Sequence, residues 1–432
     1  MKHLRTIILF SFTAMLAVAL VSCGGPQKKD DPKVVNGPVK EMHKNGKVKL
    51  TGMMTNAQKT GTWTSYYENG AVESKGDYEA DAQTGTWTFY YDTGSAKMKG
   101  AYEKGAMSGT WLVYHPNGKT ERTVSYTAGK LEGSSTRYYD TGEKSLEGQY
   151  GADERQGLWK EYYKNGKIKS LTSYKDGKQT GEYKSYFESG GIEYVGTYEN
   201  GVTNGAWSRY ENDMLREKIM FVNNITNGEC EFYFENGKIQ KKSTYVSNVL
   251  EGPEVSYFSN AGMAAEGSYA AGKRDGAWKM YNPKGFMSMA GGYKGGRREG
   301  EWKEYYPGLK IKGIGVYENG SKRNMWKYYL ETGAPDRDLT QRGEFANGRC
   351  VFYKDGKKDF EVDVSMKEID QITPKDYNGT YIKYFDDGVT KKTTGVYKMG
   401  SKHGTWTDYN AQGGVIKTEQ WLLGENKADM MK

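Results

Sequence analysis

Residues 61–70 of the chain are GTWTSYYENG, and this phrase decides the fold. It returns along the chain as a small anchor residue followed five positions later by tyrosine, most often with tryptophan in the third position. The anchors are Gly61, Gly85, Gly109, Gly133, Gly157, Gly181, Gly205, Gly228, Gly252, Gly276, Gly300, Asn324, Gly348, Gly379 and Gly404. From Gly61 to Gly348 the step is 24 residues except for one step of 23. So constant a period predicts stacked copies of one supersecondary unit, because a unit this short buries its apolar face only against its neighbours.

Each repeat contains a hairpin signal. Asn69-Gly70 lies between two β-prone runs and predicts two antiparallel strands joined by a type I′ turn. Registering the strands on that turn pairs Tyr67 with Val72, and residue 63 with residue 76. We therefore expect an all-β fold, an elongated, solenoid-like array of stacked β-hairpins that form a twisted antiparallel sheet. With 36 tyrosines and 10 tryptophans, aromatic rings are its chief packing material.

This register assigns the side chains of each hairpin to two faces. One face collects Trp63, Tyr67, Val72, Gly76 and Tyr78, and Gly76 leaves room for the facing indole of Trp63. Nine of the ten tryptophans occupy the Trp63 position, which indicates a core. A single sheet with one apolar face needs cover from its own curvature, from a partner, or from a second copy of the chain, and the sequence leaves these three open.

The opposite face is polar except for one tyrosine in each repeat. The candidate binding ladder consists of Tyr66, Tyr90, Tyr114, Tyr138 and Tyr162. Its rungs are expected about 10 Å apart, two strands from one to the next. Two interpretations are open: the rings pack over strand neighbours and lysine stems, or the ladder is a docking surface for an extended polymer or peptide.

Residues 1–22 have the pattern of a lipoprotein signal peptide, with a basic start and an apolar run from Ile7 to Val21. That run is too short to span a bilayer, which needs about 20 residues. Residues 20–23, LVSC, resemble the lipobox of bacterial lipoproteins, so we expect lipidation at Cys23; the alternative is an ordinary cleaved signal with a chance cysteine. Residues 23–45 are expected to form a lipid-anchored tether. Gly24, where aspartate resembles an inner-membrane retention signal, favours an outer membrane.

Residues 27–31, QKKDD, resemble a short tag that some Bacteroidetes-type lipoproteins use to reach the cell surface, so periplasmic and surface orientations are both open. Regular repeats are expected over residues 46–332, and C-terminal repeats with a tail over 379–432. Between them, residues 333–378 are either degenerate repeats or an insertion that meets a partner. Cys230 and Cys350 occupy tryptophan positions five repeats apart, roughly 50 Å at about 4.8 Å per strand, so we expect two unpaired thiols that fill indole pockets.

The phrase G-x-W-x-x-Y-Y-x-x-G and the connector before each anchor, as in residues 402–406 (KHGTW), resemble the bacterial variant of the MORN repeat over roughly residues 46–425. Much of that family is catalogued as antitoxin-like proteins. The resemblance implies stacked hairpins and a scaffold or membrane-associated interaction module, and it brings no catalytic residues. Asn324 at an anchor position departs from the family pattern.

Residue types that carry catalysis are not grouped in the sequence. The four histidines are not placed for metal binding or acid–base chemistry, and no phosphate loop or nucleophile elbow is present. The net charge of +8 is spread over interspersed charges rather than one basic stripe, which disfavours nucleic acid. We therefore expect no enzyme, no cofactor and no metal.

The sequence thus predicts a non-enzymatic, lipid-anchored repeat scaffold, an outer-membrane lipoprotein of a diderm bacterium that binds an unknown protein or an envelope polysaccharide. One alternative is a glycan-binding envelope protein, although aromatic wall-binding repeats usually step by about 20 residues. Another is an antitoxin- or immunity-type protein that binds a toxin, and the export signal restricts it to a toxin of the envelope.

Overall fold

The computed structural model describes residues 36–342, 345–368 and 372–426. The chain divides into two compact units. The smaller holds residues up to Ser95 together with Tyr102–Gly105, and the larger holds Ala96–Ala101 and the residues from Ala106 onward. The expected signal peptide, Cys23 and residues 24–35 of the expected tether lie outside the described residues.

The described residues form β-strands joined by tight turns, with one short 3-10 helix. The smaller unit contains β1 (Gly37–Met42), β2 (Val48–Thr55), β3 (Gln58–Tyr66), β4 (Val72–Glu79) and β5 (Ala82–Tyr90), and β6 (Ala96–Glu103) is divided between the units. The larger unit continues with β7 (Ala106–Tyr114), β8 (Thr120–Thr127), β9 (Lys130–Tyr138), β10 (Lys144–Gly151), β11 (Glu154–Tyr162), β12 (Ile168–Lys175), β13 (Lys178–Tyr186), β14 (Ile192–Glu199), β15 (Val202–Thr203), β16 (Gly205–Glu211), β17 (Met214–Val222), β18 (Ile225–Thr226), β19 (Gly228–Tyr233), β20 (Ile239–Val246), β21 (Val249–Tyr257), β22 (Met263–Ala270), β23 (Lys273–Tyr281), β24 (Met287–Lys294), β25 (Arg297–Tyr305), β26 (Ile311–Glu318), β27 (Ser321–Tyr329), β28 (Pro335–Arg342), β29 (Phe345–Lys354), β30 (Lys357–Glu368), the 3-10 helix η2 (Pro374–Asp376), β31 (Tyr377–Tyr384), β32 (Lys391–Lys398), β33 (Ser401–Tyr409), β34 (Val415–Leu422) and β35 (Glu425–Asn426).

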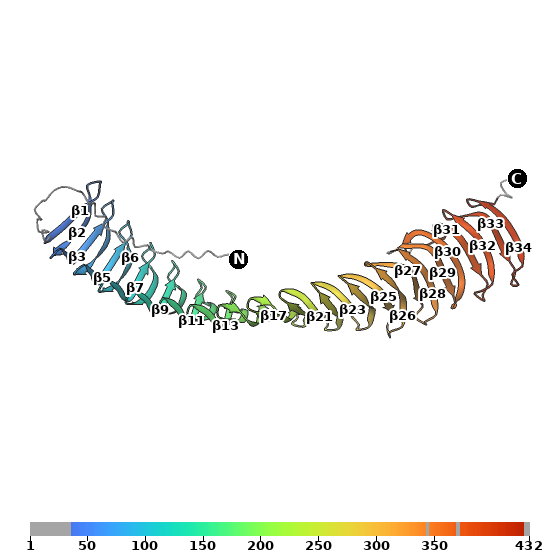
Figure 1. Ribbon diagram of the computed structural model, residues 1–432, viewed down its shortest axis with the longest axis horizontal. Helices are drawn as coiled ribbons and strands as arrows, with labels where there is room; N and C mark the ends of the chain where they lie inside the picture. Colours follow the sequence, from blue (N-terminus) through green and yellow to red (C-terminus); the bar gives the residue numbers. More distant parts are fainter. Residues whose placement is uncertain (1–35, 343–344, 369–371, 427–432) are drawn as a thin grey trace, which may run out of the picture. The chain divides into compact units, whose positions relative to one another are not determined.

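Strands that follow one another in the chain pair antiparallel in both units, except that the two-residue strands β15 and β18 are followed by β16 and β19, which pair with β14 and β17. In the larger unit the hairpins succeed one another in chain order, as the colours from cyan to red show (Figure 1). The predicted all-β class, with stacked hairpins in an antiparallel sheet, is confirmed.

The turn at Asn69-Gly70, between β3 and β4, differs from the predicted type I′ turn. Of its two central residues only Gly70 has a positive φ, of 92°. The Gly70 N–H donates to the Tyr67 carbonyl, and the Tyr67 N–H donates to the Ala71 carbonyl, both at 2.8 Å. Asn69 instead stabilises the turn with its side chain, whose Oδ1 accepts the Ala71 N–H at 2.8 Å. The Asn-Gly signal therefore located the turn correctly but gave its type wrongly.

This wider turn shifts the register of β3 against β4 next to the turn. Trp63 pairs with Gly76 as predicted, but Val72 pairs with Tyr66 rather than Tyr67. The predicted pairing of Tyr67 with Val72 is wrong by one residue, because Tyr67 belongs to the turn.

Turns with two positive φ angles lie mainly between repeats, although Asn212-Asp213 and Asp355-Gly356 form such turns inside two repeats. Ala80 and Asp81 join β4 to β5 with φ of 47° and 67°, and Asn200 and Gly201 follow β14 with 51° and 89°. Both φ signs are those of a type I′ turn, whose twist matches that of the flanking strands. These connectors fix the register of each repeat against the next.

The anchor residue of the repeat lies in a β-bulge. Thr51 pairs with Thr64 and Met53 with Thr60, so Gly61 falls inside a register shift, and its φ is 63°. Such a positive φ costs glycine nothing and asparagine little. Asn324 takes the same conformation, with φ of 58°, inside the continuous strand β27. The departure at Asn324 therefore keeps the backbone of the repeat.

Strand pairing extends beyond the range expected for regular repeats. β1, which lies inside the predicted tether, pairs with β2. Across the segment 333–378, β28, β29 and β30 continue the antiparallel pairing, and β30 pairs with β31 after η2. The segment thus adds strands to the array in the part of it that the structure describes.

Candidate functional site

The tryptophans form the core by lying over glycines of the preceding strand. A Cβ atom at Gly291 would lie 2.2 Å from Cδ2 of Trp302, and one at Gly76 would lie 2.2 Å from Cδ2 of Trp87. The indole also donates across this strand, as from Nε1 of Trp302 to the Gly292 carbonyl at 2.9 Å. The prediction that Gly76 makes room for Trp63 is therefore wrong, although the two are paired. The space at Gly76 is taken by the indole of the next repeat.

A sequence rule follows from this packing. Each of the nine tryptophans in this position has glycine eleven residues earlier, as in Gly52 and Trp63. Where another residue replaces tryptophan, a larger one replaces glycine on the preceding strand. The pairs are Val124 with Ser135, Thr172 with Tyr183, Ile219 with Cys230, Ser243 with Glu254, Leu339 with Cys350, and Val362 with Tyr381. The volume of the core is thus shared between two adjacent strands.

Cys230 and Cys350 are free and fully buried, which confirms the prediction of unpaired thiols. The space that an indole fills in other repeats is, however, taken mainly by a side chain of the preceding strand. Leu339 is paired with Cys350 and fully buried, and Ile219 stands in the corresponding place before Cys230. A small thiol suffices at these positions because a branched side chain already occupies the space.

Cations of the chain cover the outer face of several indoles. The Arg298 guanidinium carbon lies 4.7 Å from the ring centre of Trp302, and its Nη1 donates to the Tyr317 hydroxyl at 2.9 Å. Equivalent residues, four positions before a tryptophan, lie over other indoles: Lys59, Arg155, Arg274, Lys322 and Lys402. Cation–π contact and the aliphatic stems of these residues shield the rings from water. In these repeats the chain covers its own apolar face.

Trp207 lacks this cover. Eight of the nine tryptophans are buried, and Trp207 alone is half-buried. Its indole lies like the others, because Gly196 is behind it and its Nε1 donates to the Thr197 carbonyl at 3.1 Å. Four residues before it stands Thr203, whereas the other eight tryptophans have Lys, Arg, Gln or Met there. The Thr203 hydroxyl donates to Oδ1 of Asn224 at 3.0 Å, so this short side chain is also tied away from the ring.

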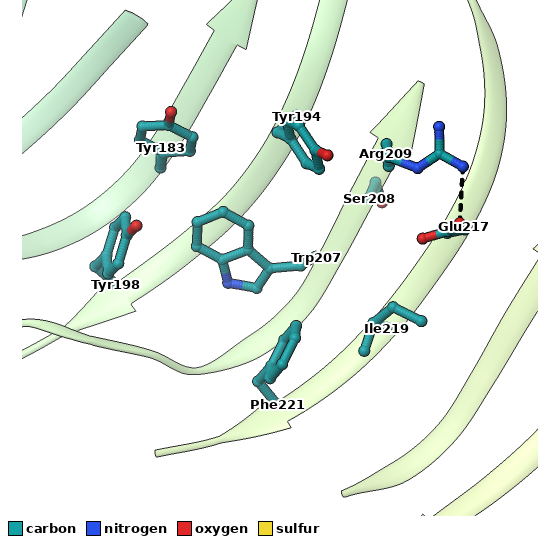
Figure 2. Close-up of a pocket in the computed structure, with 9 residues that line it drawn as sticks. All are labelled: Tyr183, Tyr194, Tyr198, Trp207, Ser208, Arg209, Glu217, Ile219 and Phe221. Carbon is teal, nitrogen blue, oxygen red and sulfur yellow. Dashed lines mark hydrogen bonds and ion pairs between the residues drawn. The ribbon is translucent and has the colours of Figure 1, made fainter. Parts of the chain in front are cut away.

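The uncovered indole lines a pocket of about 340 Å³ in the larger unit. Figure 2 shows the Trp207 ring in the middle of this pocket, surrounded by four other aromatic rings. The lining residues are Tyr183, Tyr194, Tyr198, Trp207, Ser208, Arg209, Glu217, Ile219 and Phe221. The Tyr198 ring meets the indole edge-on at 5.1 Å between ring centres, and Tyr183 stacks at 5.4 Å. We call this the Trp207 pocket.

The Trp207 pocket is aromatic with balanced charges. Arg209 Nη2 lies 2.7 Å from Oε1 of Glu217, so the two charges at one end of the pocket neutralise each other (Figure 2). Burial raises the pKa of both Tyr183 and Tyr198, so these hydroxyls stay protonated at neutral pH. An adjoining hollow of about 230 Å³ shares these two tyrosines and adds the Glu161 side chain. The site can offer π faces and hydroxyls to a ligand, because the Glu217 and Glu161 carboxylates are already paired with Arg209 and Lys169.

The five tyrosines of the predicted binding ladder are all half-buried. Tyr66, Tyr90, Tyr114, Tyr138 and Tyr162 each end the first strand of a hairpin. The carbonyl groups of four of them accept a hydrogen bond from the preceding repeat. The donors are His43 Nε2 to Tyr66, the Tyr67 hydroxyl to Tyr90, His115 Nε2 to Tyr138 and the Tyr139 hydroxyl to Tyr162, at 2.7, 2.7, 3.2 and 2.6 Å. The backbone at these positions therefore ties one repeat to the next.

The hydroxyl of a ladder tyrosine is held where an acidic residue stands fifteen positions earlier. Tyr162 donates to Oε1 of Glu147 at 2.6 Å, and Lys144 donates to Oε2 of the same carboxylate at 2.7 Å. These two hydrogen bonds, with that from Lys144 the stronger influence, hold the pKa of Glu147 below its usual value. Burial and then the hydrogen bond to Glu147 raise the pKa of Tyr162 to about 12. At this rung the polar contacts are internal to the sheet, as the packing interpretation expects.

The most connected carboxylate of the described residues is Glu361 on β30. Its oxygens accept hydrogen bonds from Tyr384 at 2.7 Å, Lys358 at 3.0 Å, and Arg349 Nη2 at 2.8 Å. Burial alone would raise the pKa of Glu361, but these hydrogen bonds outweigh burial and lower that pKa to about 2. The charged Glu361 therefore links β29, β30 and β31.

Five segments of the chain match the family described as MORN repeat variant: residues 59–80, 107–128, 155–176, 179–200 and 226–247. Each match covers one hairpin of the array, so a MORN-type repeat scaffold is the architecture that the chain shares with this family. No curated protein matches the chain.

Solved structures similar to the chain include the TcdB2-TccC3-Cdc42 crystal structure, with 9% identity, 91% of this chain and 27% of that chain covered, and a TM-score of 0.13. Another is the Tc holotoxin pore of Photorhabdus luminescens with a TccC3 mutation, with 10% identity, 91% and 26% covered, and a TM-score of 0.14. The chain spans about a quarter of these chains. Such scores are too low to support a conclusion about fold or function.

No helix in the described residues has the length and apolar character needed to cross a membrane. Their His, Cys, Asp and Glu side chains form no group of three or more that could hold a metal ion.

Sequence reasoning missed the Trp207 pocket. Two signals for it were present: Thr203 breaks the series of long side chains four residues before tryptophan, and the one 23-residue step lies between Gly205 and Gly228. Neither signal has meaning until the structure shows what those long side chains do.

Proposed function

We propose that the chain is a non-enzymatic repeat scaffold that binds a protein partner through the surface of its hairpin array. The observation that carries the proposal is the repetition itself. MORN-type hairpins place equivalent side chains in a long row, and internal contacts, such as those of Tyr162, stabilise the fold. Arrays of this kind use an extended surface for binding. The Trp207 pocket interrupts the row with an accessible aromatic site.

We further propose that the scaffold is an outer-membrane lipoprotein, anchored through lipid on Cys23. The support is in the sequence of residues 1–23, where a basic start and a short apolar run precede the lipobox-like LVSC. Several acyl chains on one cysteine anchor a protein stably, whereas one chain alone binds marginally. Replacing Cys23 with serine should release the protein from the membrane fraction, and retention of this variant would contradict the anchor.

The test of the scaffold is proximity labelling from the repeat array in the native envelope. We expect a reproducible set of protein neighbours that disappears when the labelling enzyme is carried by an unrelated lipoprotein. Enrichment of polysaccharide without protein would favour the glycan-binding alternative. In that case, replacing the ladder residues Tyr114, Tyr138 and Tyr162 with serine should abolish retention on the polysaccharide while the protein stays folded.

A further inference from the structure

The Trp207 pocket has the form of a cation site whose cation is missing from the chain. In six other repeats, a lysine or arginine four residues before the tryptophan lies over the outer face of the indole. The distances from the cationic atom to the ring centre are 4.2 Å for both Arg155 over Trp159 and Arg274 over Trp278. These internal contacts show what the outer face of such an indole accepts.

The pose of Trp207 matches that of the covered tryptophans. A Cβ at Gly196 would lie 2.1 Å from Cδ2 of Trp207, as one at Gly148 would lie 2.2 Å from Cδ2 of Trp159. One face of the indole therefore rests on the backbone in both repeats. The opposite face, which Arg155 covers in the first case, opens into the pocket in the second, because Thr203 is too short to reach it.

We propose that the Trp207 pocket binds an arginine or lysine side chain of a protein partner, which supplies the cover that the chain itself provides elsewhere. The proposal rests on the scaffold function and names the chemistry of its partner. Five aromatic rings line the pocket, and their π faces attract a cation. The Arg209 charge does not oppose it, since Glu217 neutralises it at 2.7 Å. Glu161 in the adjoining hollow is likewise paired, with Lys169 at 2.9 Å, so the aromatic rings carry the attraction.

The chemistry is tested on the full chain labelled with 5-fluorotryptophan, followed by fluorine NMR. The probe is N-acetyl-arginine amide, and its neutral control is N-acetyl-citrulline amide. The Trp207 resonance is identified by its loss in Trp207→Phe. We expect the arginine probe to shift this resonance saturably and to bind about tenfold more tightly than the citrulline control. Equal binding of the two, or a response to neutral sugars only, would overturn the proposal.

Variants at the cover position give a matched pair. Thr203→Arg should place the chain's own cation over Trp207 and abolish the response to the probe, whereas Thr203→Ser keeps the side chain short and should preserve it. The reverse change, Arg274→Thr, should expose Trp278 and create a second responsive resonance. An undiminished response in Thr203→Arg, which retains a folded spectrum, would refute the site.

Proximity labelling with the same variants separates this proposal from the scaffold function. If Thr203→Arg loses a protein neighbour that Thr203→Ser retains, the pocket is a partner contact. If both variants keep every neighbour, the scaffold stands and the pocket is not its docking point. If no neighbour is found although the arginine probe binds Trp207, the cation site stands and the scaffold function fails.

Discussion

The Gly–Trp pair of adjacent strands gives the sharpest test of the core. In Gly291→Val the new Cβ would lie 2.2 Å from Cδ2 of Trp302, whereas carbon atoms in contact are about 3.5–4.0 Å apart. Trp302 is fully buried, so the indole must leave its position. Expelling a buried tryptophan costs about as much as truncating it, 3–5 kcal/mol, and the higher strand propensity of valine returns about 1 kcal/mol. We expect Gly291→Val to lower the free energy of unfolding by about 3 kcal/mol.

The double variant Gly291→Val/Trp302→Ser tests the packing rule without relying on the loss of stability expected for either single variant. It recreates the pairing of Val124 with Ser135, in which Val124 is only 1% exposed. We expect the double variant to cost at least about 2 kcal/mol less than the sum of the single variants. Because repeat arrays can open locally, urea unfolding should be followed together with hydrogen exchange over β23–β27. Additive costs, or a loss below about 1 kcal/mol for Gly291→Val alone, would refute the packing rule.

Three further predictions concern single positions. The folded pKa of Glu361, about 2, lies below the ordinary 4.5, so its charged form should contribute up to about 3 kcal/mol to the free energy of unfolding above pH 4.5 and lose this contribution as the pH falls towards 2. Glu361→Gln should therefore flatten the pH dependence of the urea midpoint between pH 4.5 and 2. An unchanged slope would argue against the ion pairs of Glu361. Asn324→Ala should lower stability by about 1 kcal/mol, since its φ is 58°, while Asn324→Gly should be neutral; equal effects on the thermal midpoint would contradict the strained backbone. Burial raises the pKa of Cys350 to about 11 and also that of Cys230, so both thiols should resist iodoacetamide until denaturant is added, and rapid labelling of the native protein would show that they are accessible.

The sequence alone was enough to predict the repeated hairpin. A 24-residue period around Trp63 and Asn69-Gly70 left stacked hairpins as the arrangement that buries one indole per repeat, and the strands confirm it. Local sequence was a weaker guide to the turns. The Asn69 side chain stabilises a turn in which only Gly70 has a positive φ, and turns with two positive φ angles lie mainly at connectors such as Ala80-Asp81.

The candidate site was much less predictable. The tyrosine ladder and lipidation at Cys23 were proposed from sequence and remain predictions, whereas the Trp207 pocket came from the structure alone. The sequence did not predict this pocket for one reason. The pairing of Trp63 with Gly76 was correct, but the Trp63 indole lies over Gly52, on the strand at the opposite side.

What the sequence by itself determined is therefore the period, the strand pairing and the burial of the tryptophan column, because these follow from local spacing and from the need to remove indoles from water. Only the tertiary structure decided which strand each indole covers and which side chain covers the indole. Both depend on the direction in which a side chain leaves a bulged strand, and spacing along the chain does not carry that information. The consequence is concentrated at Thr203 and Trp207, where one short side chain leaves an aromatic face open.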